Sequence, residues 1–160
     1  MEICALSELF DVKYGVNLEL NALEKSHKGI NFVARTAKNN GVSAHVKRLP
    51  YVKPIPAGTI SVACGGSVLE SFLQSEPYYS GRDLFYLTAK TEMSDELKLF
   101  YCHCLRMNKF KYSYGRQANI TLPYLQVPCL EEAEKFVKGL SIQNTKKLMV
   151  QRLNILELKE

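Results

Sequence analysis

The stretch that decides the fold is NFVARTAKNNGVSAHVKRL, residues 31–49, because it places one strong turn between two strand-like runs. INFVA (30–34) is typical of a short strand, and VSAHVKRL (42–49) alternates apolar and polar residues as a returning partner would. Between them lies NNG (39–41), and both Asn and Gly tolerate the positive φ angles of a tight turn. The stretch therefore predicts an antiparallel hairpin.

The turn of this hairpin is polar and carries no acid nearby in the sequence; its candidate contact residues are Arg35, Thr36, Lys38, Asn39 and Asn40. Arginine and asparagine side chains hydrogen-bond the edges of bases, but they are equally common in an ordinary solvated turn. The residues alone leave both interpretations open.

Outward from the hairpin, further strands are expected at 7–15, 59–64 and 83–89, with a turn at YYSGR (78–82) and a segment at 67–73 whose type is left open. Ser94 predicts the start of a helix that runs to about Lys109. Its predicted apolar face consists of Leu97, Phe100, Tyr101, Cys104 and Met107.

Two more helices are expected at 130–140 and 145–159, the second with a stripe of Met149, Leu153 and Leu156. The fold class is α+β: a twisted, mostly antiparallel sheet with flanking helices, followed by C-terminal helices. We divide the chain into a β-rich domain (1–130) and a helical segment (131–160) that we expect to pack on another helix or on a second copy of the chain.

Positive charge is unevenly distributed in this chain of net charge +5. Residues 25–69 and 97–130 contain no Asp or Glu, although the first stretch has seven basic residues and the second has five: Lys25, Lys28, Arg35, Lys38, Lys47, Arg48, Lys53, and Lys98, Arg106, Lys109, Lys111, Arg116. Such segregation is expected of a surface that faces a polyanion, and it also fits a solvated face whose acids lie elsewhere.

Several function classes lack support in the sequence. No apolar run approaches the roughly 20 residues that cross a bilayer, and the first residues have no basic region typical of a secretion signal, so we expect a cytoplasmic protein. Cys102-His103-Cys104 places its cysteines on different faces of a helix and has no second pair at zinc-site spacing, so we expect reduced, buried thiols and no metal. No nucleophile–base pair and no phosphate-binding glycine loop is found, so we predict no cofactor and no catalysis.

Three polar loops remain, RTAKNNG (35–41), YYSGRD (78–83) and KYSYGRQAN (111–119). Arg, Asn and Gln can read base edges, whereas Ser, Thr, Lys and Tyr suit phosphates. Besides the five residues of the first loop, the candidate DNA contacts are Ser67, Ser80, Arg82, Lys111, Tyr112, Tyr114, Arg116, Gln117 and Asn119. The structural alternative for the third loop is that Arg116 pairs with an acid such as Asp83.

The order of three segments, 32–46, 56–87 and 114–136, resembles the target recognition domains of type I restriction–modification specificity subunits, or of related fused enzymes. The shared features are an Arg-Thr-x-x-Asn turn, a Pro-x-Gly strand, a Tyr-Gly element and a Leu-Pro-x-Leu-x-x-Pro stretch that opens a helix. The resemblance implies a non-catalytic protein that reads half of a bipartite DNA site. It also implies two partners, a methyltransferase subunit that modifies adenine and a restriction subunit that cleaves.

This chain has room for one such domain, whereas specificity subunits usually carry two with two long spacer helices. It is therefore a half-length subunit that forms a homodimer, a piece of a larger protein, or a recognition domain of a single-chain methyltransferase-nuclease. An RNA-binding module is the alternative of a different class, although 32–41 lacks the stacking aromatic arrangement of the common RNA-binding sheet.

Overall fold

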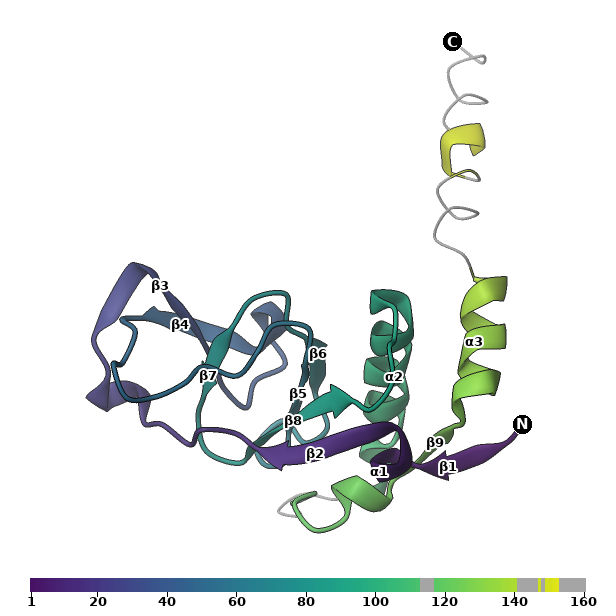
Figure 1. The fold of residues 1–160 in the computed structure, drawn as a ribbon, viewed down its shortest axis with the longest axis horizontal. Coiled ribbons are helices and arrows are strands. Elements are labelled where there is room, and N and C mark those ends of the chain that lie inside the picture. Colours follow the sequence, from purple (N-terminus) through teal and green to yellow (C-terminus); the bar gives the residue numbers. More distant parts are fainter. Residues whose placement is uncertain (113–116, 141–146, 148, 153–160) are drawn as a thin grey trace.

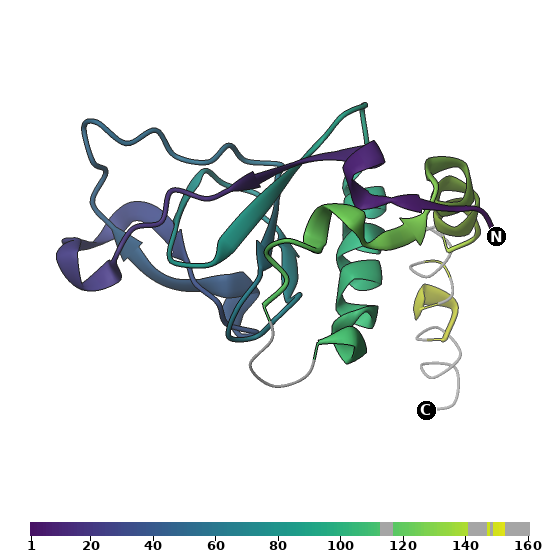
Figure 2. The same ribbon diagram turned by 90° about the horizontal axis from the view of Figure 1, so that it is seen from below.

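The computed structural model describes residues 1–112, 117–140, 147 and 149–152. It has an α+β fold in which the two larger sheets form one end and helices α2 and α3 the other (Figure 1). Helix α2 (Asp95–Met107) stands between the sheets and α3 (Leu130–Gly139), and the view turned by 90° shows the same order (Figure 2). The predicted fold class is confirmed.

Three sheets build the β-rich end and its connection to the helices. The largest has four antiparallel strands in the order β2-β8-β5-β6, with bounds β2 Phe10–Tyr14, β5 Ile60–Ala63, β6 Ser71–Leu73 and β8 Leu84–Ala89. The second has the order β4-β3-β7, with bounds β3 Lys25–Val33, β4 Val42–Val46 and β7 Tyr78–Ser80. Strands β1 (Ile3–Ala5) and β9 (Gln126–Pro128) form a short antiparallel ladder directly before α3.

The predicted hairpin is confirmed. Strands β3 and β4 pair antiparallel with Phe32 opposite Ala44, and the 3-10 turn η2 (Asn39–Gly41) joins them. All three turn residues have positive φ, 50° for Asn39, 56° for Asn40 and 78° for Gly41, the region that these residue types tolerate best. Strand β3 extends five residues further towards the amino terminus than the sequence indicated.

The predicted turn at 78–82 is wrong for its first three residues. Tyr78, Tyr79 and Ser80 form strand β7, which is fully buried and parallel to β3, with Phe32 opposite Tyr79. Parallel pairing joins strands that are distant in the sequence, so no local sequence pattern predicts it. The predicted strand at 7–15 is also partly wrong, because Leu6–Leu9 form the short helix α1 before β2 begins.

Helix α2 begins where the sequence predicted, since the Ser94 hydroxyl accepts a hydrogen bond from the Leu97 amide at 3.3 Å. Its buried face differs from the prediction and consists of Leu97, Tyr101, Cys102 and Leu105, while Met107 is 63% exposed. The reason is that α2 packs against both β6 and α3, which turns Cys102 inward and leaves Cys104 only half-buried.

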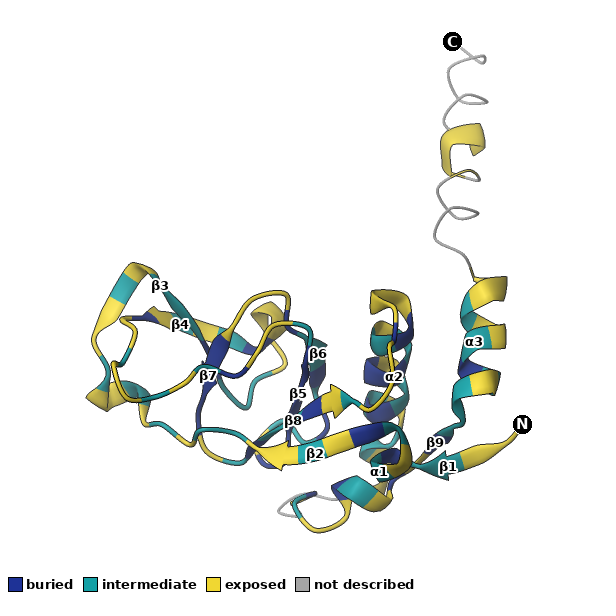
Figure 3. Ribbon diagram, viewed as in Figure 1, coloured by how far each residue is buried: buried dark blue, intermediate teal, exposed yellow. Residues whose placement is uncertain are grey.

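The main core joins the large sheet to both helices: Leu6, Ile60, Val62, Leu87, Leu105 and Ala133 belong to one buried cluster. Figure 3 shows the buried residues concentrated on β5, β7 and the inner face of α2, whereas the far end of β3 is largely exposed. No helix in the described ranges is long and apolar enough to span a bilayer.

Helix α3 confirms the second predicted helix, and it packs on α2, where the rings of Phe100 and Phe136 lie 5.0 Å apart. Of the third predicted helix, residues 147 and 149–152 are helical. Leu153 and Leu156 lie outside the described residues. The division at residue 130 stays a prediction.

Candidate nucleic-acid interface

The three predicted loops converge on one strand end, residues 64–66 after β5. The Cys64 amide donates to the Asp83 carbonyl at 2.8 Å, and the Ala118 amide donates to the Cys64 carbonyl at 3.0 Å. Arg35 lies against the two glycines that follow, because a Cβ on Gly65 would lie 2.8 Å from its guanidinium. The glycine pair therefore makes room for an arginine from the first loop, while the backbone of the same strand end holds the other two loops.

Arg35 forms an ion pair within the protein. One guanidinium nitrogen lies 2.8 Å from a carboxylate oxygen of Asp83, and the Arg35 side chain remains 36% exposed. The first loop has no acid near it in the sequence, and the fold supplies one, Asp83, from the second loop. Asp83, the acid that the structural alternative assigns to Arg116, already pairs with Arg35. Arg116 itself lies outside the described residues.

The two asparagines of the turn use their side-chain NH groups to hold the turn. Asn39 donates to the Val42 carbonyl at 3.0 Å, and Asn40 donates to the Leu73 carbonyl at 3.2 Å. The buried Gln74 amide in turn donates to the Asn40 carbonyl at 2.9 Å. Both side chains are exposed, and their amide oxygens accept no hydrogen bond from the described residues. A ligand would therefore find a free acceptor on each asparagine more readily than a free donor.

Lys38 extends from the same turn into solvent, and the Thr36 hydroxyl accepts a hydrogen bond from its amide at 3.2 Å. Ser67 is half-buried, and its backbone carbonyl accepts a hydrogen bond from the Glu70 amide at 3.1 Å. Neither Thr36 nor Ser67 projects a long side chain, so Lys38 is the group of this region with the greatest reach.

The second loop separates Ser80 from Arg82. Ser80 is fully buried and its hydroxyl accepts a hydrogen bond from the Val16 amide at 2.9 Å, so we correct its assignment from DNA contact to structural residue. Arg82 is exposed, and it precedes Asp83, whose φ of 53° turns the chain sharply. The Asp83 amide donates to the Tyr14 hydroxyl at 3.0 Å, which fixes that turn.

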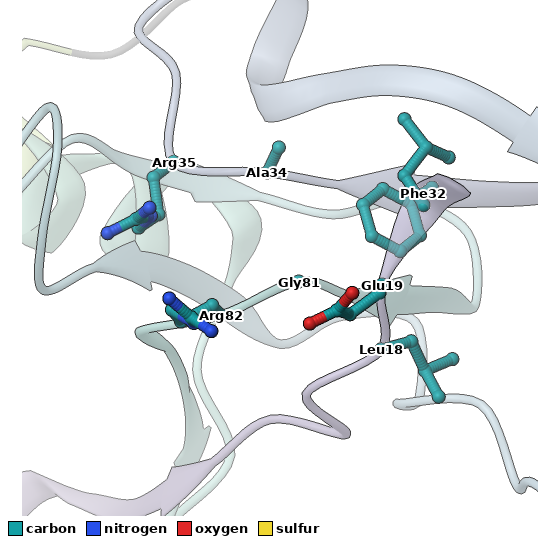
Figure 4. A pocket seen from close by; sticks show the side chains of 8 residues that line it. Leu18, Glu19, Phe32, Ala34, Arg35, Gly81 and Arg82 are labelled. Atoms are coloured by element: carbon teal, nitrogen blue, oxygen red, sulfur yellow. The ribbon is translucent and has the colours of Figure 1, made fainter. Parts of the chain in front are cut away.

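Arg35 and Arg82 line a depression of about 370 Å³, together with Leu18, Glu19, Leu20, Phe32, Ala34 and Gly81 (Figure 4). Its lining mixes apolar and charged side chains, and Figure 4 shows the Glu19 carboxylate directed towards the side on which Arg82 lies. Sequence reasoning missed Glu19. No signal marked it, because it is a single acid in a segment without a motif.

The third loop contributes to a second hollow of about 450 Å³, lined by Lys111, Tyr112, Gln117, Thr121, Tyr124 and Leu125. The Tyr112 and Thr121 hydroxyls lie 2.6 Å apart, and Asn119 donates to the Gln117 side chain at 3.1 Å. Lys111 and Gln117 are exposed beside this hollow. Tyr114 and Arg116, the other candidates of the loop, lie outside the described residues.

Comparison with known families decides what this arrangement belongs to. The model of the type I restriction modification DNA specificity domain matches residues 1–158. The chain belongs to this family. No curated protein matches the chain.

Three solved structures resemble the fold of this specificity domain. A structure of a type I restriction–modification system, described by its complex assembly and conformational transition, is 16% identical with a TM-score of 0.67, over 98% of this chain and 41% of that one. The HsdS subunit from Thermoanaerobacter tengcongensis is 17% identical with a TM-score of 0.65, over 95% and 39%. The S subunit from M. genitalium is 19% identical with a TM-score of 0.58, over 97% and 43%. The chain thus spans about two fifths of each of these chains.

The fold brings acids to the acid-free stretches of this specificity domain. Besides Arg35 with Asp83, Lys47 lies 3.6 Å from Glu24, and Lys109 pairs with the mostly buried Glu70. Lys38 and Lys111 have no ion pair within the part of the chain that the structure describes. Fewer basic side chains are therefore unpaired than the sequence suggested. Two of the unpaired ones, Lys38 and Lys111, belong to the candidate loops.

Of the five free cysteines of the specificity domain, two are buried as expected and the other three are half-buried. Burial raises the pKa of both Cys64 and Cys102 to about 12, so each is a neutral thiol at pH 7. Among the described residues no three His, Cys, Asp or Glu side chains are grouped so that they could hold a metal ion. The absence of zinc stays a prediction, to be checked by elemental analysis.

Proposed function

We propose that this chain binds duplex DNA sequence-specifically and reads one half of a bipartite site for a restriction–modification system. The observation that carries the proposal is the convergence of three polar loops around residues 64–66 in a member of the DNA specificity domain family. Loops held by a rigid scaffold are where binding residues concentrate, because the scaffold pays the entropy of ordering them in advance.

The side chains divide into groups that hold the loops and groups that meet DNA. Arg35 and the amides of Asn39 and Asn40 hold the loops through their internal partners. Arg82 and Gln117 have the forked groups that base edges require, and Lys38 and Lys111 are point charges suited to phosphates. Tyr114 and Arg116 remain proposed contacts by their position in the third loop, beside Tyr112 and Asn119.

The partners follow from the family. We propose that a methyltransferase subunit supplies adenine methylation and a restriction subunit supplies cleavage, while this chain supplies neither and acts in the cytoplasm without a cofactor. Assembly would use α3 and the residues that follow, where Phe136, Leu140, Met149 and Val150 are exposed. Because the chain spans two fifths of the solved specificity subunits, a second copy or further chain would complete the bipartite site.

The test is co-purification of the full chain with a type I methyltransferase subunit, followed by selection from a randomised duplex library at two salt concentrations. A reproducible enriched motif, resistant to single-stranded RNA competitor, is the expected result. Tighter binding to the RNA competitor than to any duplex would instead favour the RNA-binding alternative, and no motif at either salt concentration would remove the proposed function.

A further inference from the structure

Glu19 is an acid that lies among residues proposed to face DNA. It lines the depression of Figure 4 together with Arg82 and Arg35. Neither the Glu19 carboxylate nor the Arg82 guanidinium has a hydrogen bond or an ion pair within the described residues, whereas Arg35 of the first loop pairs with Asp83. A carboxylate in this place repels phosphates, so its position needs a different explanation.

The backbone around the depression is fixed before any ligand arrives. The Leu18 amide donates to the Ser80 carbonyl at 2.9 Å, and the Gly81 amide donates to the Val33 carbonyl at 3.0 Å. Gly81 also packs against the Phe32 ring, where a Cβ would lie 3.3 Å from the nearest ring carbon. These contacts join the segments that carry Glu19, Arg82 and Arg35 into one unit.

The backbone turns through a residue with positive φ close to each of Glu19 and Arg82. Asn17 has φ 50° two positions before Glu19, and Asp83 has φ 53° directly after Arg82. Asn and Asp adopt this conformation more readily than other side-chain-bearing residues, and the hydrogen bonds of the Val16, Leu18 and Asp83 amides hold the two turns. The backbone therefore fixes where an acceptor, Glu19, and a forked donor, Arg82, leave the fold.

This arrangement matches one base pair better than the others. In the major groove a guanine offers two adjacent acceptors, N7 and O6, and its cytosine offers the N4 amino group as a donor beside them. An arginine fits the two acceptors with its fork, and a carboxylate accepts from the N4 amino group. An A·T pair places its donor between two acceptors and offers the arginine no adjacent pair of acceptors.

We propose that Glu19 and Arg82 together read one C·G pair of the DNA site, with Glu19 accepting from cytosine N4 and Arg82 donating to guanine. The inference rests on the proposed function and adds a specificity-determining residue that lies outside all three loops. Glu19 then acts by discrimination, since it weakens binding to DNA in general and strengthens binding where a cytosine amino group meets it.

The experiment compares motifs selected from a randomised duplex library by the full chain and by Glu19→Ala, at one salt concentration. The expected variant motif keeps every position except one C·G pair, where preference falls by roughly 5- to 150-fold, the equivalent of about 1–3 kcal/mol. Glu24→Ala is the matched control, because Glu24 is an exposed acid five residues away that does not line the depression. Arg82→Lys keeps the charge but loses the fork, and it should relax the same base pair.

The two variants separate the possible roles of Glu19. If the carboxylate only repels phosphates, Glu19→Ala and Glu24→Ala both bind all duplexes more tightly and select the parental motif, which overturns the inference. A relaxed position in Glu19→Ala that differs from the position relaxed in Arg82→Lys overturns the pairing of the two residues. If the parental chain itself selects no motif, the proposed function fails. If the parental chain selects a motif that Glu19→Ala leaves unchanged, only the inference about Glu19 fails. Melting curves of each variant show whether the fold is kept.

Discussion

The two ends of the molecule are stabilised by different interactions. At the helical end α2 contributes Leu97, Tyr101 and Leu105 to an apolar core. At the sheet end the core is divided into two smaller clusters, and buried polar residues fix the loops: Thr59, Ser61, Ser71, Gln74 and Ser80. Apolar packing is non-directional and sets overall stability, whereas hydrogen bonds are directional and set the position of a loop. The comparison teaches that stability and loop geometry are carried by separate residues.

The largest effect is expected from the helical end. Leu105→Ala removes a fully buried side chain from the core and should lower the free energy of unfolding by about 2–5 kcal/mol. Leu99→Ala, on the same helix but half-exposed, should change it by about 0.5 kcal/mol or less. Urea denaturation measures both, and equal losses would show that the helix is not the source of stability.

A smaller loss of stability with a larger effect on binding is expected from Gln74→Leu. The buried Gln74 side-chain amide donates to the carbonyl of the exposed Asn40 and, at 3.0 Å, to the buried Ser61 hydroxyl, so the substitution removes both bonds and leaves the Ser61 hydroxyl without this partner. We expect a loss of about 1–3 kcal/mol in stability. Duplex affinity should fall further because the turn that carries Lys38 loosens. Ser75→Ala, at the exposed neighbour, serves as the control; if Gln74→Leu leaves affinity unchanged, the turn does not need this bond.

Two neighbouring arginines sharpen the comparison within the sheet end. The sequence marks Arg35 as a candidate DNA contact, so Arg35→Ala should weaken duplex binding. Because Arg35 pairs with Asp83, we now expect it also to cost about 0.5–1 kcal/mol of stability. Arg82→Ala should leave the melting temperature unchanged and cost about 1–3 kcal/mol on the selected site with little effect on random DNA. Melting curves and affinities for the selected site and for random DNA measure both effects. A loss of stability in Arg82→Ala with a site-specific loss of affinity in Arg35→Ala would reverse the assignment of the two arginines.

The smallest effect concerns phosphate contacts. Lys38→Ala should lower affinity on all sequences alike and reduce the slope of log affinity against log salt by about one unit. Lys47→Ala should reduce the slope less, because Lys47 already lies beside Glu24. Titrations at four salt concentrations compare them, and equal slopes would mean that the Lys47–Glu24 pair opens when DNA binds.

Local signals predicted those elements whose cause lies within a few residues. The NNG turn, the strands at 59–64 and 83–89 and the helix start at Ser94 all follow from backbone preferences or capping at those positions. The predicted helix face missed Cys102 because α2 also packs against β6, where the Cys102 thiol lies beside the Leu73 backbone. A single apolar stripe cannot reveal how many partners a helix has.

The sequence by itself determined the hairpin, the fold class and the family, since turn chemistry, periodicity and the order of motifs are all written along the chain. Only the tertiary structure decided the parallel pairing of β7 with β3, the partnership of Arg35 with Asp83 and the place of Glu19 beside Arg82. These pairings join residues far apart in sequence, 48 positions for Arg35 and Asp83. Such contacts form only when the whole chain has folded, because the free energy that places them comes from the packing of several elements together and not from the residues that meet.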